Sequence, residues 1–111
     1  MQTVVETNAF LTAAKSAGMS EDERSQVVTL LALDPMRGVV PSGWGGARKF
    51  RFARPGKGKS GSYRIVTAYC GPGAPVFLIT VFGKGEKANL SRAEANELAK
   101  LVKKLCASYG E

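Results

Sequence analysis

The side chains of this chain that could do chemistry gather in one central stretch, residues 47–69, which reads ARKFRFARPGKGKSGSYRIVTAY. Seven of them are basic and none is acidic: Arg48, Lys49, Arg51, Arg54, Lys57, Lys59 and Arg64. Asp and Glu are absent between Asp34 and Glu86, an interval with nine basic residues, whereas the flanks carry seven basic and nine acidic residues. The net charge of +7 therefore comes from this interval alone. Positive charge so concentrated attracts polyanions, of which phosphate backbones are the most common.

Arg64 is the most informative of these residues. Alternation along residues 62–66 places Arg64 on one face of a strand with Ser62 and Val66. An arginine beside Lys49 or Arg51 of a neighbouring strand is repelled unless an anion lies between them. Scattered charges usually lie on a solvated sheet face, but seven cations without an acidic partner favour a phosphate-binding surface.

Residues 56–61 (GKGKSG) contain the letters of G-x-G-x-x-G and also of Gly-Lys-Ser. Both nucleotide-binding motifs must open a helix, whereas a strand is expected to follow here, so we interpret both matches as coincidence. What remains is a glycine-rich turn whose lysines and backbone N–H groups can approach phosphate oxygens.

The composition limits the chemistry further. The chain has no histidine, which excludes the commonest general acid–base and every Ser-His or Cys-His pair, and no metal site is expected. No apolar run reaches the length of a membrane span and the N-terminus lacks a signal-peptide pattern, so we expect a cytoplasmic protein. Cys70 and Cys106 are therefore predicted to be reduced, small core residues rather than a disulfide. The length of 111 residues predicts one domain, residues 1–111.

Local patterns predict the elements that position the basic stretch. A strand is expected over residues 3–7, followed by a helix capped by Asn8 that ends at Gly18. Ser20 and Glu23 form a capping box for a second helix, which must end before Pro35. Three strands follow, at residues 49–52, 62–70 and 76–82. A further capping box, Ser91 with Glu94, opens an amphipathic C-terminal helix. We thus expect an α+β fold in which a helical hairpin packs on an antiparallel meander.

Three segments of this chain resemble the RelE/ParE superfamily of type II toxins, and specifically its HigB-like RelE branch. They are residues 45–51 (GGARKFR), 56–65 (GKGKSGSYRI) and 78–90 (LITVFGKGEKANL), and with the helix after Leu90 they cover nearly the whole chain. The resemblance implies a RelE-like microbarrel, with the N-terminal strand and helical hairpin on a curved antiparallel sheet. It also implies a ribosome-dependent endoribonuclease (an mRNA interferase) that cuts the codon in the ribosomal A site and so inhibits translation.

Further expectations about mechanism and partners follow from the same resemblance. The ribose 2′-OH attacks the adjacent phosphate without a metal or other cofactor. The partners are the 70S ribosome with its mRNA and a cognate antitoxin, usually a helix-turn-helix protein, through which alone the toxin meets operator DNA.

By position in the family motif, Arg64 is the first catalytic candidate, because a planar guanidinium can engage two oxygens of the phosphorane. Lys57, Lys59 and Lys84 follow for base or phosphate work, since neighbouring cations lower the pKa of a lysine. The RNA-binding candidates are Arg48, Lys49, Arg51, Arg54, Phe82 and Lys87. Family members commonly have tyrosine where this chain has Phe82, which can stack but cannot transfer a proton. Tyr69 would replace it if it faced the site.

Two other functions fit the same residues. The basic stretch alone would suffice for a non-catalytic nucleic-acid-binding module. A ParE-like gyrase inhibitor would share the fold and lack a nuclease site. The lysine-rich turn with Arg64 in the next strand favours the nuclease.

Overall fold

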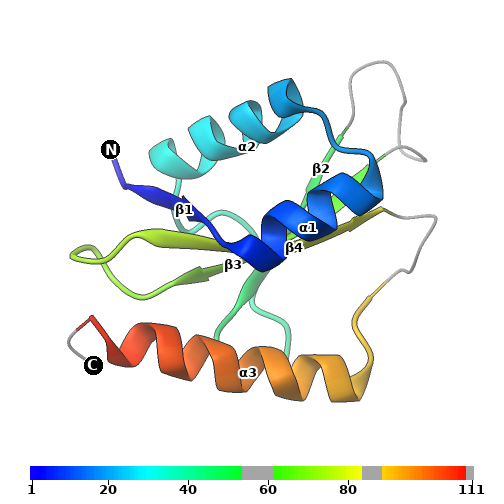
Figure 1. Cartoon of the computed structure of the whole chain (residues 1–111). Coiled ribbons are helices and arrows are strands. Elements are labelled where there is room, and N and C mark those ends of the chain that lie inside the picture. Colours follow the sequence, from blue (N-terminus) through cyan, green and yellow to red (C-terminus); the bar gives the residue numbers. More distant parts are fainter. Residues whose placement is uncertain (54–61, 84–88, 110–111) are drawn as a thin grey trace.

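The computed structural model describes residues 1–53, 62–83 and 89–109. Its elements in chain order are β1 (Val4–Glu6), α1 (Asn8–Ala17), α2 (Glu21–Leu33), β2 (Arg48–Phe52), β3 (Tyr63–Tyr69), β4 (Val76–Gly83) and α3 (Arg92–Ala107) (Figure 1). The strands form one sheet in the order β1-β4-β3-β2. β2, β3 and β4 are the predicted antiparallel meander, whereas β1 pairs with β4 in parallel. The α+β prediction is confirmed.

Helix starts follow the predicted caps in two of three cases. Ser20 with Glu23, and Ser91 with Glu94, form reciprocal capping boxes at the N-termini of α2 and α3. For α1 the cap is Thr7 rather than Asn8, because Thr7 still has extended geometry and its hydroxyl accepts a hydrogen bond from the Phe10 N–H at 3.1 Å. β1 is shorter than the predicted strand over residues 3–7, although the Thr7 N–H still donates to the Leu78 carbonyl.

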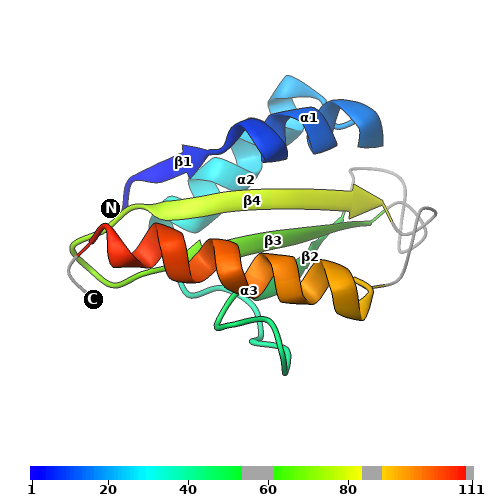
Figure 2. The same cartoon turned by 60° about the horizontal axis from the view of Figure 1, so that its bottom comes forward.

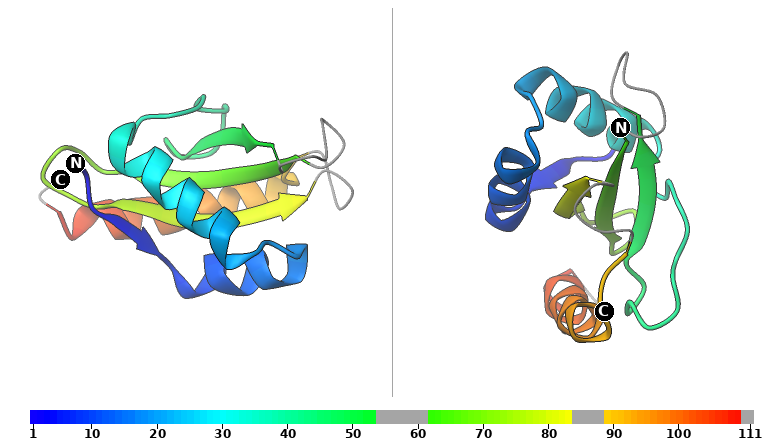
Figure 3. Two further views of the ribbon diagram at one scale, coloured as in Figure 1. Left: turned by 90° about the horizontal axis from the view of Figure 1, so that it is seen from above. Right: turned by 90° about the vertical axis from the view of Figure 1, so that its right-hand side faces the viewer.

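The helices divide between the two faces of the sheet, with α1 and α2 on one face and α3 on the other (Figures 2 and 3). The core under the hairpin contains fully buried side chains from both helices and the sheet, including Phe10, Val27, Leu31 and Ile65. The core under α3 is built from the opposite side chains of the same strands, with Leu98 and Val102 as the buried residues of α3. This hairpin placement is the predicted one.

A polar contact lies inside the core under the hairpin. The Tyr63 hydroxyl donates to Glu23 Oε1 at 3.1 Å, and the same oxygen accepts the Ser20 N–H at 2.8 Å. Glu23 thus links the start of α2 to the start of β3. Nearby, Glu6 accepts from Arg24 Nε at 2.9 Å, which raises the pKa of the Arg24 guanidinium and ties β1 to α2.

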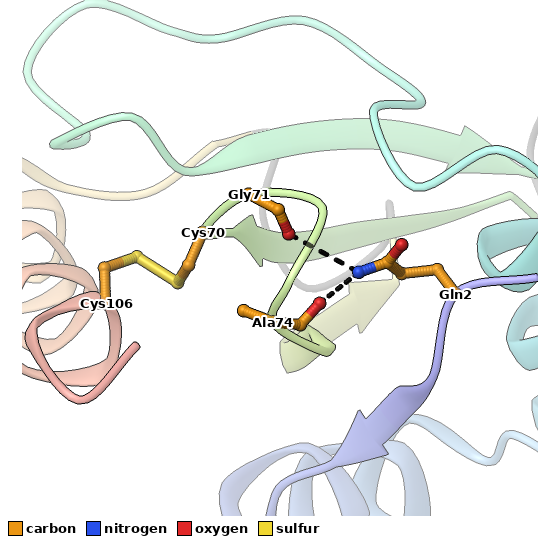
Figure 4. The surroundings of a disulfide bond; sticks show 5 residues. All are labelled: Gln2, Cys70, Gly71, Ala74 and Cys106. Carbon is orange, nitrogen blue, oxygen red and sulfur yellow. Dashed lines mark hydrogen bonds between the residues drawn. A yellow bond between two sulfur atoms is a disulfide. The ribbon is translucent and has the colours of Figure 1, made fainter. Parts of the chain in front are cut away.

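The prediction of two reduced cysteines is wrong for this structure. Cys70 follows β3, Cys106 lies in the last turn of α3, and a disulfide joins them, with their Cα atoms 5.1 Å apart (Figure 4). They are 36 residues apart in the chain, so only the return of α3 along the sheet brings them together. Both remain half-buried against the core under α3, as expected of small apolar residues. The turn after Cys70 is also held from the other side, because the Gln2 amide donates to the carbonyls of Gly71 and Ala74.

Candidate nucleic-acid interface

Arg51, Arg64 and Phe82 lie in one row across β2, β3 and β4. Arg51 pairs with Arg64, and Arg64 pairs with Phe82 on its other side. Directly opposed residues of an antiparallel pair point to the same face. Phe82 packs in the core under α3, so the row belongs to the α3 face of the sheet. The predicted juxtaposition of Arg64 with a cation of the neighbouring strand is therefore present.

The surroundings of Arg64 leave part of its hydrogen-bonding capacity unused. The side chain is half-buried, and its Nη1 is buried without a partner among the described residues. The Oγ of Ser62, two residues earlier and 2 % exposed, also lacks a partner there. A buried donor without an acceptor costs free energy, of the order of 1–3 kcal/mol or more for a charged group. An anion placed against Arg64 would remove this cost and the repulsion from Arg51.

Arg48 and Lys49 begin the same basic strand. Arg48 Nη1 donates to the Met36 carbonyl at 3.1 Å, and Lys49 Nζ lies 5.7 Å from the centre of the Trp44 ring. Trp44 is 3 % exposed and packs in the core under α3, so it offers no free face to a base. In the described part of the chain, neither Arg48, Lys49, Arg51 nor Arg64 forms an ion pair with a carboxylate.

The two aromatic candidates differ in position. Phe82 lies beside Arg64 but is 3 % exposed, so a base could stack on it only after the covering side chains move. Tyr69 lies at the other end of β3, opposite Val76, and packs against the core under the hairpin. At about 3.3 Å per residue, five residues separate it from Arg64 by roughly 16 Å. It does not face the row.

Arg54, Lys57, Lys59, Lys84 and Lys87 lie outside the described residues. The strand ends that flank their segments are described, however. β2 ends at Phe52 opposite Tyr63, the first residue of β3, and Tyr63 in turn pairs with Gly83, the last residue of β4. These described strand ends lie at the end of the sheet that holds Arg64.

Sequence reasoning missed Arg37 as a neighbour of β2, on the hairpin face of the sheet and therefore opposite Arg51 and Arg64. Its guanidinium carbon lies 5.6 Å from the centre of the Phe50 ring, which brings a further cation to β2 although the residue is in another segment. No sequence signal indicates this contact, since it depends on the turn after α2. Among the described residues there is also no group of three or more His, Cys, Asp and Glu side chains that could hold a metal ion.

The arrangement can bind phosphate oxygens through a guanidinium that has a free, partly dehydrated donor and a second guanidinium opposite. No helix in the described residues has the length and apolarity of a membrane span. In a comparison with protein families, the family described as the RelE toxin of the RelE / RelB toxin-antitoxin system matches residues 2–111. That match includes every element of the fold.

Proposed function

The chain belongs to the RelE toxin family, and from this we propose that it cuts messenger RNA on translating ribosomes as the toxin of a type II toxin–antitoxin system. The observation that best supports a nuclease is the half-buried Arg64, with its unpaired Nη1 beside Arg51 and no carboxylate partner in the described residues. A site that is electrostatically unfavourable when empty favours a ligand rich in negative charge, such as RNA in the ribosomal A site.

The proposed reaction is an internal transesterification. The ribose 2′-OH loses its proton to a base and its oxygen attacks the adjacent phosphorus, while the bond from phosphorus to the 5′ oxygen breaks. The leaving oxygen takes up a proton, so the products carry a 2′,3′-cyclic phosphate and a 5′-OH. The reaction involves no change of oxidation state, and its atoms balance without a metal ion.

Arg64 is proposed to stabilise the negative charge on the phosphorane, which develops beyond that of the ground state. Lys57, Lys59 and Lys84 are proposed to supply the base, the acid and further phosphate contacts. Lysine can act as a base near neutral pH when neighbouring cations lower its pKa. Phe82 has no ionisable group and cannot exchange protons, so it can contribute only by packing or stacking.

Arg48, Lys49, Arg51, Arg54 and Lys87 are proposed to contact the phosphate backbones of ribosomal and messenger RNA. A toxin of this family pairs with a RelB-like antitoxin. We further propose that the chain belongs to the HigB-like branch and that it acts in the cytoplasm on 70S ribosomes. Its antitoxin is proposed to be of the helix-turn-helix type and to be the only link between the toxin and operator DNA.

The test is cleavage of a defined mRNA by the purified protein, with and without ribosomes programmed at one codon. We expect cutting only on ribosomes, and none when the nucleotide before the cut carries a 2′-deoxyribose. Equal cutting of naked RNA would discard the A-site mechanism. Ribosome binding without cutting would favour the non-catalytic binding module, and absence of both would direct the search to inhibition of gyrase supercoiling.

A further inference from the structure

The segment after α2 exposes an unusual number of large apolar side chains. Eight large hydrophobic residues are exposed in the described part of the chain, and four of them occur within residues 33–40. Their exposed fractions are 68 % for Leu33, 52 % for Met36, 62 % for Val39 and 48 % for Val40. We call these four side chains the 33–40 patch. Single exposed apolar residues are normal, whereas a cluster of them indicates an interaction surface.

The backbone under this patch is fixed by specific contacts. Val39 and Lys49 exchange two backbone hydrogen bonds, of 3.0 and 2.9 Å, along the outer edge of β2. Gly38 has a φ of 103°, and a Cβ at this position would lie 2.3 Å from the Lys49 carbonyl oxygen. The Met36 carbonyl accepts a hydrogen bond from Arg48, and the Arg37 N–H donates to the Asp34 carbonyl. The apolar side chains are thus held outward on an ordered backbone.

The surroundings of the patch are cationic. Arg37 lies over Phe50, Arg48 reaches the Met36 carbonyl, and Lys49 pairs directly with Val39. The one carboxylate beside them in this segment, Asp34, is 3.8 Å from Arg37 and leaves a net positive rim. Such a surface complements a chain segment that presents apolar side chains together with Asp or Glu.

We propose that the 33–40 patch with its cationic rim is the docking site for an acidic, apolar-faced segment of the cognate antitoxin. This proposal rests on the proposed function, and it specifies how the basic strand is silenced. Aliphatic side chains offer RNA neither a stacking plane nor hydrogen bonds, so the patch fits a protein partner better than the ribosomal RNA. A segment bound there would cover the outer edge of β2 and screen Arg48, Lys49 and Arg51 from RNA.

A second apolar groove, of about 580 Å³, lies between α1, β4 and α3. Its α3 side carries Glu94 and Glu97, and its Leu101 also borders Lys100, Lys103 and Lys104, so the rim is of mixed charge, unlike that of the 33–40 patch. This groove therefore supplies the matched control. Leu101, which lines it, is 37 % exposed, so Leu101→Asp places the same charge on another apolar surface.

The experiment measures the affinity of the antitoxin encoded in the same operon for wild-type protein, Met36→Asp, Val39→Asp and Leu101→Asp by calorimetry. Equal unfolding midpoints show that all four proteins are folded. We expect each patch variant to weaken binding by at least about tenfold, as loss of an interface anchor does, and Leu101→Asp to weaken it less than about twofold. Arg37→Glu should lower the association rate most at low salt.

Three results would overturn the proposal. The first is unchanged antitoxin affinity of both patch variants, and the second is a loss of antitoxin affinity confined to Leu101→Asp. The third is self-association of the wild type that Met36→Asp abolishes, which would assign the patch to a second copy of the chain. Cleavage on programmed ribosomes is measured in parallel without antitoxin. Wild-type cutting that persists in both patch variants while antitoxin affinity is unchanged would reject the docking site and keep the proposed nuclease. If the wild-type protein does not cut mRNA but the affinities follow the predicted pattern, the docking site is kept and the proposed nuclease is rejected.

Discussion

Tyr63 and Arg64 are neighbours in β3 and point to opposite faces of the sheet, where they meet opposite conditions. Tyr63 is 1 % exposed, and its hydroxyl donates to Glu23 within the core under the hairpin. Arg64 faces the α3 side with a buried Nη1 that has no partner in the described residues, directly opposite another arginine. At this end of the sheet, one face buries a satisfied hydrogen bond, and the other holds a buried donor without a partner among the described residues. Functional sites commonly contain such locally unfavourable arrangements.

The largest expected effect belongs to Arg64. Arg64→Ala should lower the single-turnover rate of mRNA cleavage on ribosomes by about 10²–10³-fold, the usual cost of removing one donor to a developing negative charge. Arg64→Lys should restore little of the rate, because an ammonium cannot bridge two oxygens. Ribosome affinity should change little in both variants. Full activity of Arg64→Ala would remove Arg64 from the site.

Loss of the disulfide should loosen the α3 face selectively. Residues Leu98 and Val102 are the buried anchors of α3, and the Cys70–Cys106 bond closes a loop across 36 positions. The double variant Cys70→Ser/Cys106→Ser should lose about 2–4 kcal/mol of unfolding free energy in urea. Hydrogen exchange should accelerate in α3 more than in α1 and α2. Because glutathione keeps most cytosolic thiols reduced, thiol trapping in cells will show which form acts there. Identical exchange in α3 with and without dithiothreitol would contradict the selective effect.

Tyr63→Phe tests the stable face. It removes the hydroxyl that donates to the buried Glu23 carboxylate, while the ring and its packing remain. Hydrogen bonds to charged groups contribute about 1.5–3 kcal/mol, so the unfolding free energy should fall by roughly that amount. Cleavage at a temperature where the variant is fully folded should stay within about twofold of wild type, since the change is conservative and lies on the opposite face. A large loss of rate in folded protein would show that the two faces are coupled.

Arg51→Ala should have the smallest effect. Arg51 is exposed and opposite Arg64, so it is expected to contact phosphate rather than to perform chemistry. Ribosome affinity should fall a few-fold, and the slope of log affinity against log salt should become shallower by about 0.7–0.9. Lys100→Ala on the exposed side of α3, where Lys100 pairs with Glu97, is the control and should leave the slope unchanged. Equal slopes for wild type and Arg51→Ala would exclude a phosphate contact.

Local signals were sufficient for most of the fold. The Ser20 and Ser91 capping boxes fix helix starts through contacts three residues apart, and alternation around Phe50 and Phe52 fixes the faces of β2. Thr7 was missed as a cap because its role depends on pairing with Leu78, which is distant in the chain. The disulfide was missed because thiols of a cytoplasmic protein are expected to be reduced, and because only the packing of α3 brings Cys70 and Cys106 together.

The site was only partly readable from sequence. The clustering of cations follows from composition, and the strand face that Arg64 shares with Ser62 and Val66 follows from alternation. That Arg64 meets Arg51 rather than Lys49 depends on strand register, and the burial of Phe82 depends on the packing of α3. The position of Arg37 over Phe50 depends on a turn whose geometry requires Gly38. Long-range contacts of this kind leave no periodic pattern in the sequence.

The most direct test compares wild type, Arg64→Ala and Tyr63→Phe side by side, with cleavage on programmed ribosomes and urea unfolding measured on the same preparations. We expect Arg64→Ala to lose cleavage and to be at least as stable as wild type, because a buried unpaired donor and a like-charge contact disappear. We expect Tyr63→Phe to lose stability and keep cleavage. If Arg64→Ala cuts normally, or if both variants lose stability and activity together, the division of the sheet into a stabilising face and a chemical face is wrong.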